Sequence, residues 1–430
     1  MPEVCVDGFN LSIPKGSGIA TYGRNLLKAY GDLGWTPGVL HGPAHLGGDG
    51  LLRNISLLDA PQGQKPLPKL ERWARTLRSP LGRRASRVDV TGEVIRPPDD
   101  ELQHLAQRHW AAARIFELSQ RSQRAYGRFT PLKFDGGGPD IAHWTCPLPI
   151  WAPGRVNLLT LHDIIPIRLP YTTTDDKHRY VELCRESAKR ADHILAVSET
   201  TRRDAINLLG IEPGRITTTY QSVSLPDDIL AMDDEALERE LGGVFDLRPR
   251  SYFLFFGALE PKKNVRRLLE AYLTSGVQAP LVVVGGRAWL DGGEATLLSA
   301  AATPIDHVRR GRVIQYDFLG RGLLLRLIRG ARATLFPSLY EGFGLPALES
   351  MALGTPVIAS TEGSLPEVVG DAGVLVDPYA VEALREAITR MDADEDLRSD
   401  LALRGPVRAR MFSPEAHRER LRDVLDRVGA

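Results

Sequence analysis

Two glutamates, Glu341 and Glu349, lie on either side of the predicted N-terminus of a helix. The backbone amides there have no partner inside the helix, and the helix dipole adds positive charge, so the place suits a phosphate. These amides belong to Phe343, Gly344 and Leu345. Because a carboxylate only accepts hydrogen bonds, the glutamates suit the hydroxyls of diols. A phosphate flanked by diols describes a nucleotide-sugar; the alternative is an ordinary crossover with two solvated glutamates.

Local signals predict how these glutamates are positioned. Apolar strands are expected over 333–336 and 357–359, and between them a helix is expected to begin at Pro346 and to end at Gly354. Gly342 has no Cβ, so it would let a ligand approach the loop backbone closely. The segment is therefore a strand-loop-helix-strand unit with its ligand at the loop.

Length and composition limit the classes of protein to which the chain can belong. Its 430 residues are enough for two or three domains, and its 54 basic and 54 acidic side chains give no overall attraction to nucleic acid. Three widely spaced cysteines, Cys5, Cys146 and Cys184, argue for a reducing compartment and against a disulfide framework or a zinc site. The chain lacks a signal-peptide pattern and a long apolar run. A soluble, cytoplasmic protein is expected, with attachment to a membrane surface left open.

The N-terminal half holds two candidate ligand-binding places. The first strand is followed by a loop with Gly16 and Gly18, but this loop of about ten residues is too long for the tight turn of a dinucleotide site. His162 and Asp163 follow a predicted strand over 156–161, and the carboxyl ends of parallel strands face the ligand crevice. A single histidine there could also be a packed structural residue.

The C-terminal half has two adjacent lysines after a strand. A buried strand is expected over 252–256, and the loop after Gly257 carries Lys262 and Lys263. At the crevice these lysines could neutralise a departing diphosphate, although adjacent lysines are usually just exposed. Strands alternate with helices in both halves, which indicates an α/β fold with two Rossmann-like domains facing a cleft.

The segment from about 42 to 138 departs from this alternation. It is rich in proline, glycine and arginine, and it shows apolar residues at helical spacing: Leu102, Leu105, Trp110, Ala113 and Phe116. Basic residues are densest from Arg72 to Arg87. They could form an amphipathic surface on anionic lipid headgroups, or a solvated insertion packed on the domain. A nucleic-acid surface is not expected, because no aromatic binding motif accompanies the charge.

Three strings of sequence resemble one known family. PSLYEGFGLPALE, followed by GSLPEVVGDAG, resembles the signature of retaining glycosyltransferases of family 4, glycosyl transferases group 1, which have the GT-B fold. TLHDIIPI resembles the family's His-Asp segment, and ALEPKKN resembles its phosphate-binding loop. Together these strings contain candidate ligand-binding residues from both halves of the chain.

The resemblance implies a role for each candidate residue. Glu341 would hold hydroxyls of the donor sugar, and Glu349 would hold the ribose diol. Lys263 would bind the diphosphate, with Lys262 beside it. The other residues that the resemblance places around the donor are His162, Asp163, Gly16, Gly18, Phe343, Gly344 and Leu345.

The resemblance also implies the domain organisation. An acceptor-side domain over 1–226 would contain the basic insertion at about 42–138. The segment 227–250 is acidic and then polar and is punctuated by proline and glycine, which by itself predicts a linker between the domains. A nucleotide-sugar-binding domain would span 251–410, and a helix over 411–430 would cross back to the first domain.

The implied reaction is metal-independent, retaining transfer of a hexose from a nucleotide-sugar to a glycan or polyprenyl-linked glycan in surface polysaccharide synthesis. The expected donor is GDP-mannose first and a UDP-hexose second. Asp392 and Asp394 have the D-x-D spacing of metal-dependent transferases, but they lie in an acidic helical surface, so no metal or other cofactor is expected. A sugar-nucleotide epimerase or hydrolase of the same fold remains the alternative. An anionic membrane surface is a further possible partner.

Overall fold

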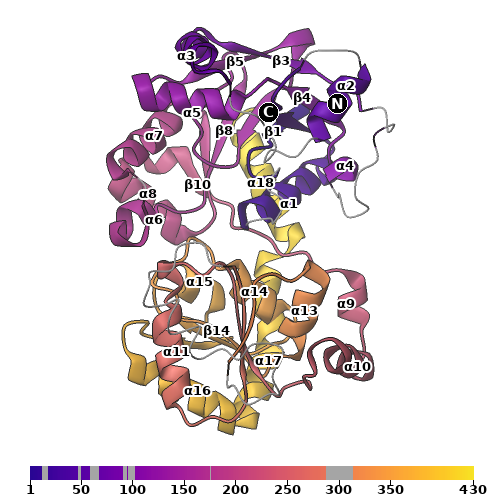
Figure 1. Cartoon of the computed structure of the whole chain (residues 1–430), viewed down its shortest axis with the longest axis vertical. Coiled ribbons are helices and arrows are strands. Elements are labelled where there is room, and N and C mark those ends of the chain that lie inside the picture. Colours follow the sequence, from indigo (N-terminus) through magenta and orange to yellow (C-terminus); the bar gives the residue numbers. More distant parts are fainter. Residues whose placement is uncertain are drawn as a thin grey trace.

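Two β-sheets, each flanked by helices, form the two domains of the protein (Figure 1). The computed structural model describes residues 1–11, 18–46, 50–58, 67–90, 94, 102–174, 176–286 and 313–430. The first sheet has ten strands in the order β10-β9-β8-β6-β1-β2-β4-β3-β5-β7, and the second has six in the order β13-β12-β11-β14-β15-β16. All pairings in these described sheets are parallel except that between β3 and β4.

The strands are short and lie mostly within apolar runs. Those of the first sheet are β1 (Glu3–Asp7), β2 (Thr36–His41), β3 (Arg83–Arg87), β4 (Arg108–Ala111), β5 (Thr130–Phe134), β6 (Ile141–Trp144), β7 (Ile150–Trp151), β8 (Val156–Leu161), β9 (His193–Ala196) and β10 (Ile216–Thr218). Those of the second are β11 (Phe253–Phe256), β12 (Leu281–Val284), β13 (Val313–Tyr316), β14 (Ala333–Phe336), β15 (Val357–Ser360) and β16 (Val374–Val376).

Helices connect these strands. Those of the first half are α1 (Gly18–Asp32), α2 (Gly50–Leu58), α3 (Lys69–Arg78), α4 (Leu102–Leu105), α5 (Ile115–Tyr126), α6 (Ile165–Arg168), α7 (Lys177–Arg190) and α8 (Glu199–Leu209). Those of the second half are α9 (Asp227–Ala231), α10 (Asp234–Phe245), α11 (Val265–Thr274), α13 (Arg321–Gly330), α14 (Leu345–Ala352), α15 (Leu365–Val369), α16 (Val381–Ala393), α17 (Glu395–Ala409) and α18 (Pro414–Arg427).

The order of the strands places a crevice in each domain. β11 pairs with β12 on one side and with β14 on the other, with Phe253 opposite Leu281 and Ala333. The chain therefore proceeds away from β11 in both directions, and the loops after β11 and β14 diverge, which is where parallel sheets hold ligands. β1 has the same position between β2 and β6 in the first sheet.

The segment from 42 to 138 adds strands to the first sheet. β4 pairs with β2, and β3 joins β4 to β5. The helical spacing expected from Leu102 to Phe116 is wrong, because Trp110 lies in β4 and is buried. Its indole packs over Gly38 of β2, where a Cβ would lie 2.3 Å from the ring. Tertiary packing of the tryptophan thus overrides the local helical pattern.

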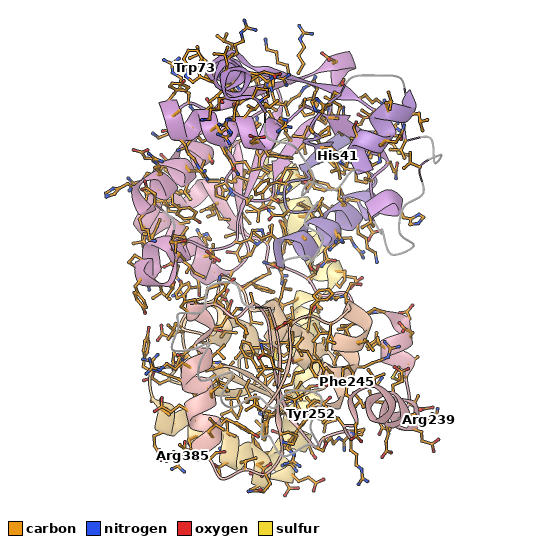
Figure 2. All side chains as sticks on the ribbon, in the orientation of Figure 1. His41, Trp73, Arg239, Phe245, Tyr252 and Arg385 are labelled. Atoms are coloured by element: carbon orange, nitrogen blue, oxygen red, sulfur yellow. The ribbon has the colours of Figure 1, made fainter. Side chains whose placement is uncertain are left out.

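The segment 227–250, expected to be a linker, forms α9 and α10 of the second domain. α10 packs on α13. Its buried Leu237, Leu241 and Phe245 belong to the same core cluster as Tyr252, the residue before β11; Figure 2 labels Phe245 and Tyr252. The acidic residues that suggested a linker lie in the first turns of these helices, where they stabilise the helix dipole. The chain therefore crosses from the first domain to the second just before α9.

The last helix returns to the first domain, as the fold class predicted. α18 packs on α1, and its Leu421, Val424 and Leu425 share a core with residues of β1 and α1 (Figure 1). Arg418 of α18 also pairs with Asp32 at the end of α1. In the described part of the chain no helix combines the length and apolarity needed to span a membrane.

Candidate active site

Lys263 and Glu341 meet at the crevice of the second domain. Lys263 ends a short turn after β11, and Glu341 lies in the loop between β14 and α14, so neighbouring strands deliver both. The Lys263 Nζ donates to Glu341 Oε1 at 2.6 Å, and the two side chains are only 13% and 12% exposed. Burial favours the neutral form of Glu341, but Lys263 and Lys262 outweigh it and hold its pKa below the ordinary value. Glu341 is therefore a carboxylate in this pair.

Backbone contacts orient this ion pair. The carbonyl of Glu341 accepts hydrogen bonds from the amide and hydroxyl of Ser364, at 3.2 and 3.0 Å. The carbonyl of Lys262 accepts from the amide of Leu339 at 2.7 Å, which ties the lysine loop to the glutamate loop. The buried side chain of Asn264 donates to the carbonyls of Pro337 and Pro378. Both loops are thus fixed before any ligand binds.

The start of α14 provides the expected amide site. Gly344 is the N-cap residue at φ 102°, a conformation that favours glycine. Over the described residues, the amides of Phe343, Gly344 and Leu345 donate to no protein acceptor. The side chain of Phe343 is buried and packs on Phe412, with ring centroids 5.6 Å apart, so this residue offers a ligand only its backbone. The arrangement suits an anion held by main-chain amides.

Glu349 lies on α14 and pairs with Arg321 at the start of α13. The guanidinium donates to Glu349 Oε1 at 2.9 Å and also reaches the carbonyl of Ser224, between the domains. Burial raises the pKa of Glu349 above its ordinary value, and Arg321 offsets part of this effect. Arg321 was not predicted from the sequence, because the pairing joins two helices and has no local signal.

His162 is held as a neutral imidazole. Its Nε2 donates to the carbonyl of Thr145 at 2.9 Å, and its Nδ1 accepts from the side-chain amide of Gln221 at 3.1 Å. Burial lowers the pKa of His162 to about 4, although Asp163 opposes the shift. Gln221 was not predicted from the sequence, because its segment carries no recognised motif.

A buried carboxylate, that of Asp7, is linked to His162 through the backbone of Thr145. Asp7, at the end of β1, accepts a hydrogen bond from the amide of Thr145, whose carbonyl binds His162. Burial raises the pKa of Asp7 to about 6. Asp7, Thr145 and His162 therefore form a chain at the carboxyl ends of β1, β6 and β8.

The two domains touch beside the ion pair. A Cβ on Gly342 would lie 1.9 Å from the carbonyl oxygen of His162, so the glycine permits direct backbone contact across the interface. The carbonyl of Gly342 accepts from the hydroxyls of Ser198 and Thr201, at 2.6 and 3.1 Å. The structure thus brings His162 of the first domain next to the loop that carries Glu341.

Lys262 and Asp163 lie close across the same interface. Burial disfavours the charged form of Lys262, but Asp163, Glu341 and Glu260 outweigh it and raise its pKa. The ammonium of Lys262 lies 3.4 Å from Glu260, and Asp163 accepts from the amide of Ile165 at the start of α6. Two lysines and two carboxylates of the second domain, Glu260 and Glu341, therefore lie near Asp163 of the first domain.

The glycine-rich loop is described only at its end. Gly16 lies outside the described residues, whereas Gly18 begins α1. A Cβ on Gly18 would lie 3.8 Å from Leu345 Cδ1, so the end of this loop faces the start of α14. Gly18 of the first domain and the amide site of the second therefore lie on opposite sides of the crevice.

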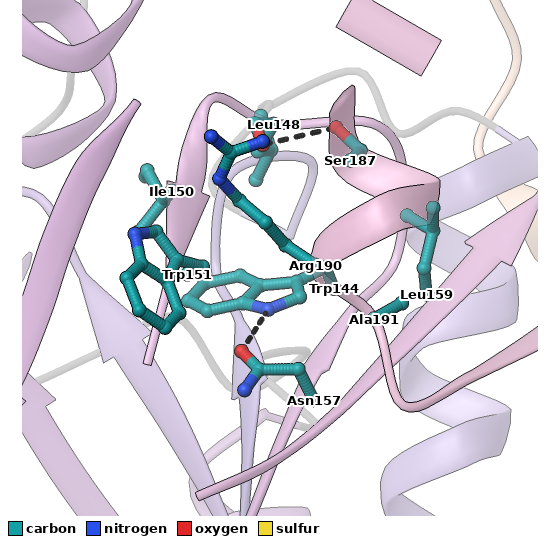
Figure 3. A pocket seen from close by; sticks show the side chains of 9 residues that line it. All are labelled: Trp144, Leu148, Ile150, Trp151, Asn157, Leu159, Ser187, Arg190 and Ala191. Atoms are coloured by element: carbon teal, nitrogen blue, oxygen red, sulfur yellow. Dashed lines mark hydrogen bonds between the residues drawn. The ribbon is translucent and has the colours of Figure 1, made fainter. Parts of the chain in front are cut away.

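Two other features lie outside this site. Asp392 pairs with Arg332, and Asp394 is the N-cap of α17, where it accepts from Leu397 at 2.9 Å, so both have structural partners. A cavity of about 10 Å³ is lined by Trp144, Asn157 and Arg190, among others. Figure 3 shows these side chains. The cavity has room for one water molecule, and the indole of Trp144 donates to Asn157 in its wall.

Comparison with known proteins gives the class of the fold and then the family. The chain superimposes over 100% of its length on sucrose-phosphate synthase from Thermosynechococcus elongatus, with a TM-score of 0.67 and 17% identity, covering 99% of that chain. It also superimposes over 99% of its length on Anabaena Alr3699/HepE in complex with UDP and glucose, at a TM-score of 0.63 and 15% identity, covering all of that chain. The protein has the GT-B fold, which confirms the expected fold class.

Sequence comparison assigns the family. Residues 16–225 match the model Glycosyltransferase Family 4, and residues 247–407 match Glycosyl transferases group 1. O-antigen chain mannosyltransferase B from Escherichia coli is 36% identical over 261 residues, 60% of this chain. This chain spans 66% of that relative's length and less of the other curated relatives compared. The chain belongs to glycosyltransferase family 4, as its sequence motifs predicted.

Proposed function

We propose that the protein is a retaining glycosyltransferase that moves a hexose from a nucleotide diphosphate sugar to a glycan acceptor. One observation carries the proposal: the ion pair of Lys263 and Glu341 lies in the loops that flank the start of α14, where three amides donate to no acceptor among the described residues. A cation and amide donors suit a diphosphate, and an adjacent carboxylate suits sugar hydroxyls. Family membership supports this assignment.

Each residue has a distinct part in the proposed complex. The diphosphate would lie between Lys263 and the amides of α14, where fixed positive charge stabilises the charge that develops as it leaves. Glu341 would accept hydrogen bonds from the donor sugar, and Glu349 would accept them from the ribose diol. His162, neutral and fixed by two hydrogen bonds, would contact the sugar from the first domain.

The proposed reaction exchanges one bond to the anomeric carbon for another on the same face. The bond from this carbon to the phosphate oxygen breaks, and a bond to the acceptor oxygen forms. The acceptor proton passes to an oxygen of the departing diphosphate. This oxygen acts as the base on that face of the sugar, so the proposed step needs no other base. Lys262, Lys263 and α14 would stabilise the released nucleoside diphosphate, so the proposal requires no metal.

We also propose a donor and an acceptor, and the names of the relatives support this choice. The name of the Escherichia coli relative, an O-antigen chain mannosyltransferase, favours GDP-mannose as the donor and a surface polysaccharide as the product. The UDP in the Anabaena complex keeps a UDP-hexose as the second candidate. The acceptor would be a glycan or polyprenyl-linked glycan at the cytoplasmic face of a membrane.

Product analysis tests the proposed reaction. The purified chain would be incubated with GDP-mannose or UDP-hexoses and a mannose-containing oligosaccharide, with and without EDTA. We expect a new α-linked hexose in the product, detected by NMR, and no loss of rate with EDTA. A β-linked product from an α-linked donor would contradict retention. A changed sugar nucleotide, or free hexose as the sole product when an acceptor is present, would identify an epimerase or hydrolase instead.

A further inference from the structure

Helix α3 exposes its apolar side chains to solvent. Leu70, Trp73 and Leu77 of α3 are 78%, 59% and 47% exposed, and Leu81, in the turn that follows, is 85% exposed. Their spacing of three, four and four residues places them on one face of a continuous helical path. We refer to these four residues as the α3 stripe.

The opposite face of α3 is polar and fixed to the domain. Thr76 is buried and its hydroxyl donates to the carbonyl of Arg72 at 2.7 Å. Ser79, at the end of the helix, is buried and its hydroxyl lies 2.8 Å from that of Thr130 in β5. An ordinary surface helix buries its apolar face, so the orientation of α3 is reversed. The reversal indicates that the stripe is a contact surface for something outside the domain.

The surroundings of the stripe are basic. Residues 67–90 contain two acidic side chains and seven basic ones, which are Lys69, Arg72, Arg75, Arg78, Arg83, Arg84 and Arg87. Arg75 pairs with Glu71, and Arg84 pairs with Asp135. Within the described residues Lys69, Arg72 and Arg78 form no ion pair, so the helix keeps a positive charge beside its apolar face.

The stripe lies far from the candidate active site. In Figure 1, α3 lies at the end of the first domain that points away from the second domain. Figure 2 shows Trp73 at this outer edge, with no element of the second domain near it. A partner on the stripe would therefore leave the crevice between the domains open.

We propose that the α3 stripe docks the protein on a membrane surface that contains anionic lipid. The leucines and Trp73 would enter the boundary between headgroups and acyl chains, and the neighbouring basic side chains would contact lipid phosphates. Tryptophan favours this boundary, and an apolar face beside basic residues is the pattern of helices that lie in it. A protein partner would need acidic groups around an apolar groove, whereas an anionic bilayer offers both on any face. The proposal does not depend on which sugar the protein transfers.

Vesicle binding by the full chain tests the proposal. We expect the protein to sediment with phosphatidylcholine vesicles that contain phosphatidylglycerol, and to do so at least about tenfold less with phosphatidylcholine alone or in high salt. The double variant Leu70→Ser/Trp73→Ser should lower the affinity for anionic vesicles by about tenfold or more, because each removes apolar area from the contact. Its thermal unfolding and its transfer rate to a water-soluble acceptor should match the wild type.

A matched exposed leucine serves as the control. Leu403 of α17 is 76% exposed on the second domain, and Leu403→Ser should leave vesicle binding unchanged. The proposal is overturned if the stripe variant binds vesicles like the wild type, or if neither vesicle binds the wild type. It is also overturned if the wild type is a dimer without lipid that the stripe variant converts to a monomer, which would make the stripe an interface between copies.

Discussion

The ion pair of Lys263 and Glu341 shows how a single contact can both cost stability and prepare a site. Removing two charges from water is unfavourable, and their attraction offsets this only while both partners remain. The structure keeps them 2.6 Å apart with little exposure to solvent. A bound diphosphate would present Lys263 with a second anionic partner. The site therefore holds its cation ready, with the carboxylate as its only close anionic partner among the described residues.

Replacing Glu341 by glutamine should separate these effects. Glu341→Gln leaves the buried Lys263 ammonium without its carboxylate, so we expect the unliganded protein to lose about 3 kcal/mol of stability. Added nucleoside diphosphate should raise the melting temperature of the variant more than that of the wild type, because phosphate replaces the lost charge. Transfer should fall by at least about 100-fold.

Glu186, whose side chain is 35% exposed, gives the matched control for this experiment. It pairs with Lys189 and Arg190 on the surface of α7, where ion pairs contribute little. Glu186→Gln should change neither transfer nor the response to nucleotide. Equal nucleotide stabilisation of the wild type and of Glu341→Gln would contradict the assigned role of the pair.

Gly342 is required by the contact between the domains. A methyl group at this position would overlap the carbonyl of His162, so Gly342→Ala must separate the two domains locally. A misplacement of about 1 Å can lower a rate by about 100-fold, and we expect kcat/KM for transfer to fall by that order. A Cβ on Gly242 in α10 would meet no described atom within 4 Å, so Gly242→Ala should keep full activity and add slightly to stability. Unchanged kinetics of Gly342→Ala would show that this contact is not needed for transfer.

At the scale of elements, the N-terminus of α8 holds the second domain. The amides of Glu199 and Thr200, which begin α8, donate to the two carboxylate oxygens of Glu367 at 2.7 and 3.1 Å. Glu367 belongs to α15 of the second domain, and the Thr200 hydroxyl also donates to it at 3.2 Å. A carboxylate at a helix N-terminus gains from the dipole as well as from these bonds. This contact stabilises the arrangement in which the two domains touch, which we call the closed form.

The variant Glu367→Gln should favour domain opening. Its amide nitrogen cannot accept a hydrogen bond from α8, and its charge is lost, so the closed form should become about 1–2 kcal/mol less favourable. Small-angle X-ray scattering should show a larger radius of gyration without donor, and saturating donor should reverse the change. Glu270→Gln, at an exposed position of α11, is the control and should scatter like the wild type. An unchanged radius of gyration for Glu367→Gln would show that the contact with α8 does not hold the domains closed.

At the scale of the whole molecule, buried histidines link stability to pH. Burial lowers the pKa of His143 to about 3 and those of His162 and His417 to about 4. Between these values and the ordinary pKa near 6.5, the unfolded chain binds protons that the folded protein does not. Their contribution to stability is therefore complete above pH 6.5 and is lost as the pH falls toward 4. Asp7 and Glu349, whose pKa values are raised by burial, act in the opposite sense and offset part of this effect.

Urea unfolding at two pH values should reveal this linkage. We expect a lower midpoint at pH 5 than at pH 7.5, with up to about 2 kcal/mol lost for each of the three histidines. His417→Gln should reduce the difference between the two pH values, whereas His178→Gln, at an exposed position of α7, should not. A protein that is equally stable at both pH values would contradict the neutral state assigned to these histidines.

The sequence alone determined the parts of the protein that depend on local patterns. Continuous apolar runs such as 253–256 identify buried strands, because both faces of a parallel sheet are covered. The loop and helix around Glu341 and Glu349 follow from glycine and proline signals within about twenty residues. These patterns, with the family motifs, were enough to predict the fold class and to name several of the residues that lie at the crevice, Lys263 and Glu341 among them.

Only the tertiary structure decided which distant groups meet. Gln221 binds His162 across 59 positions, and Gly342 contacts His162 from the other domain. The helices α9 and α10 looked like a linker because their acidic first turns dominate the composition, yet their apolar residues complete the second core. Local propensity cannot encode such contacts, since their free energy arises from surfaces that exist only after both elements have folded. For the same reason, the outward direction of the α3 stripe is a property of the packed domain.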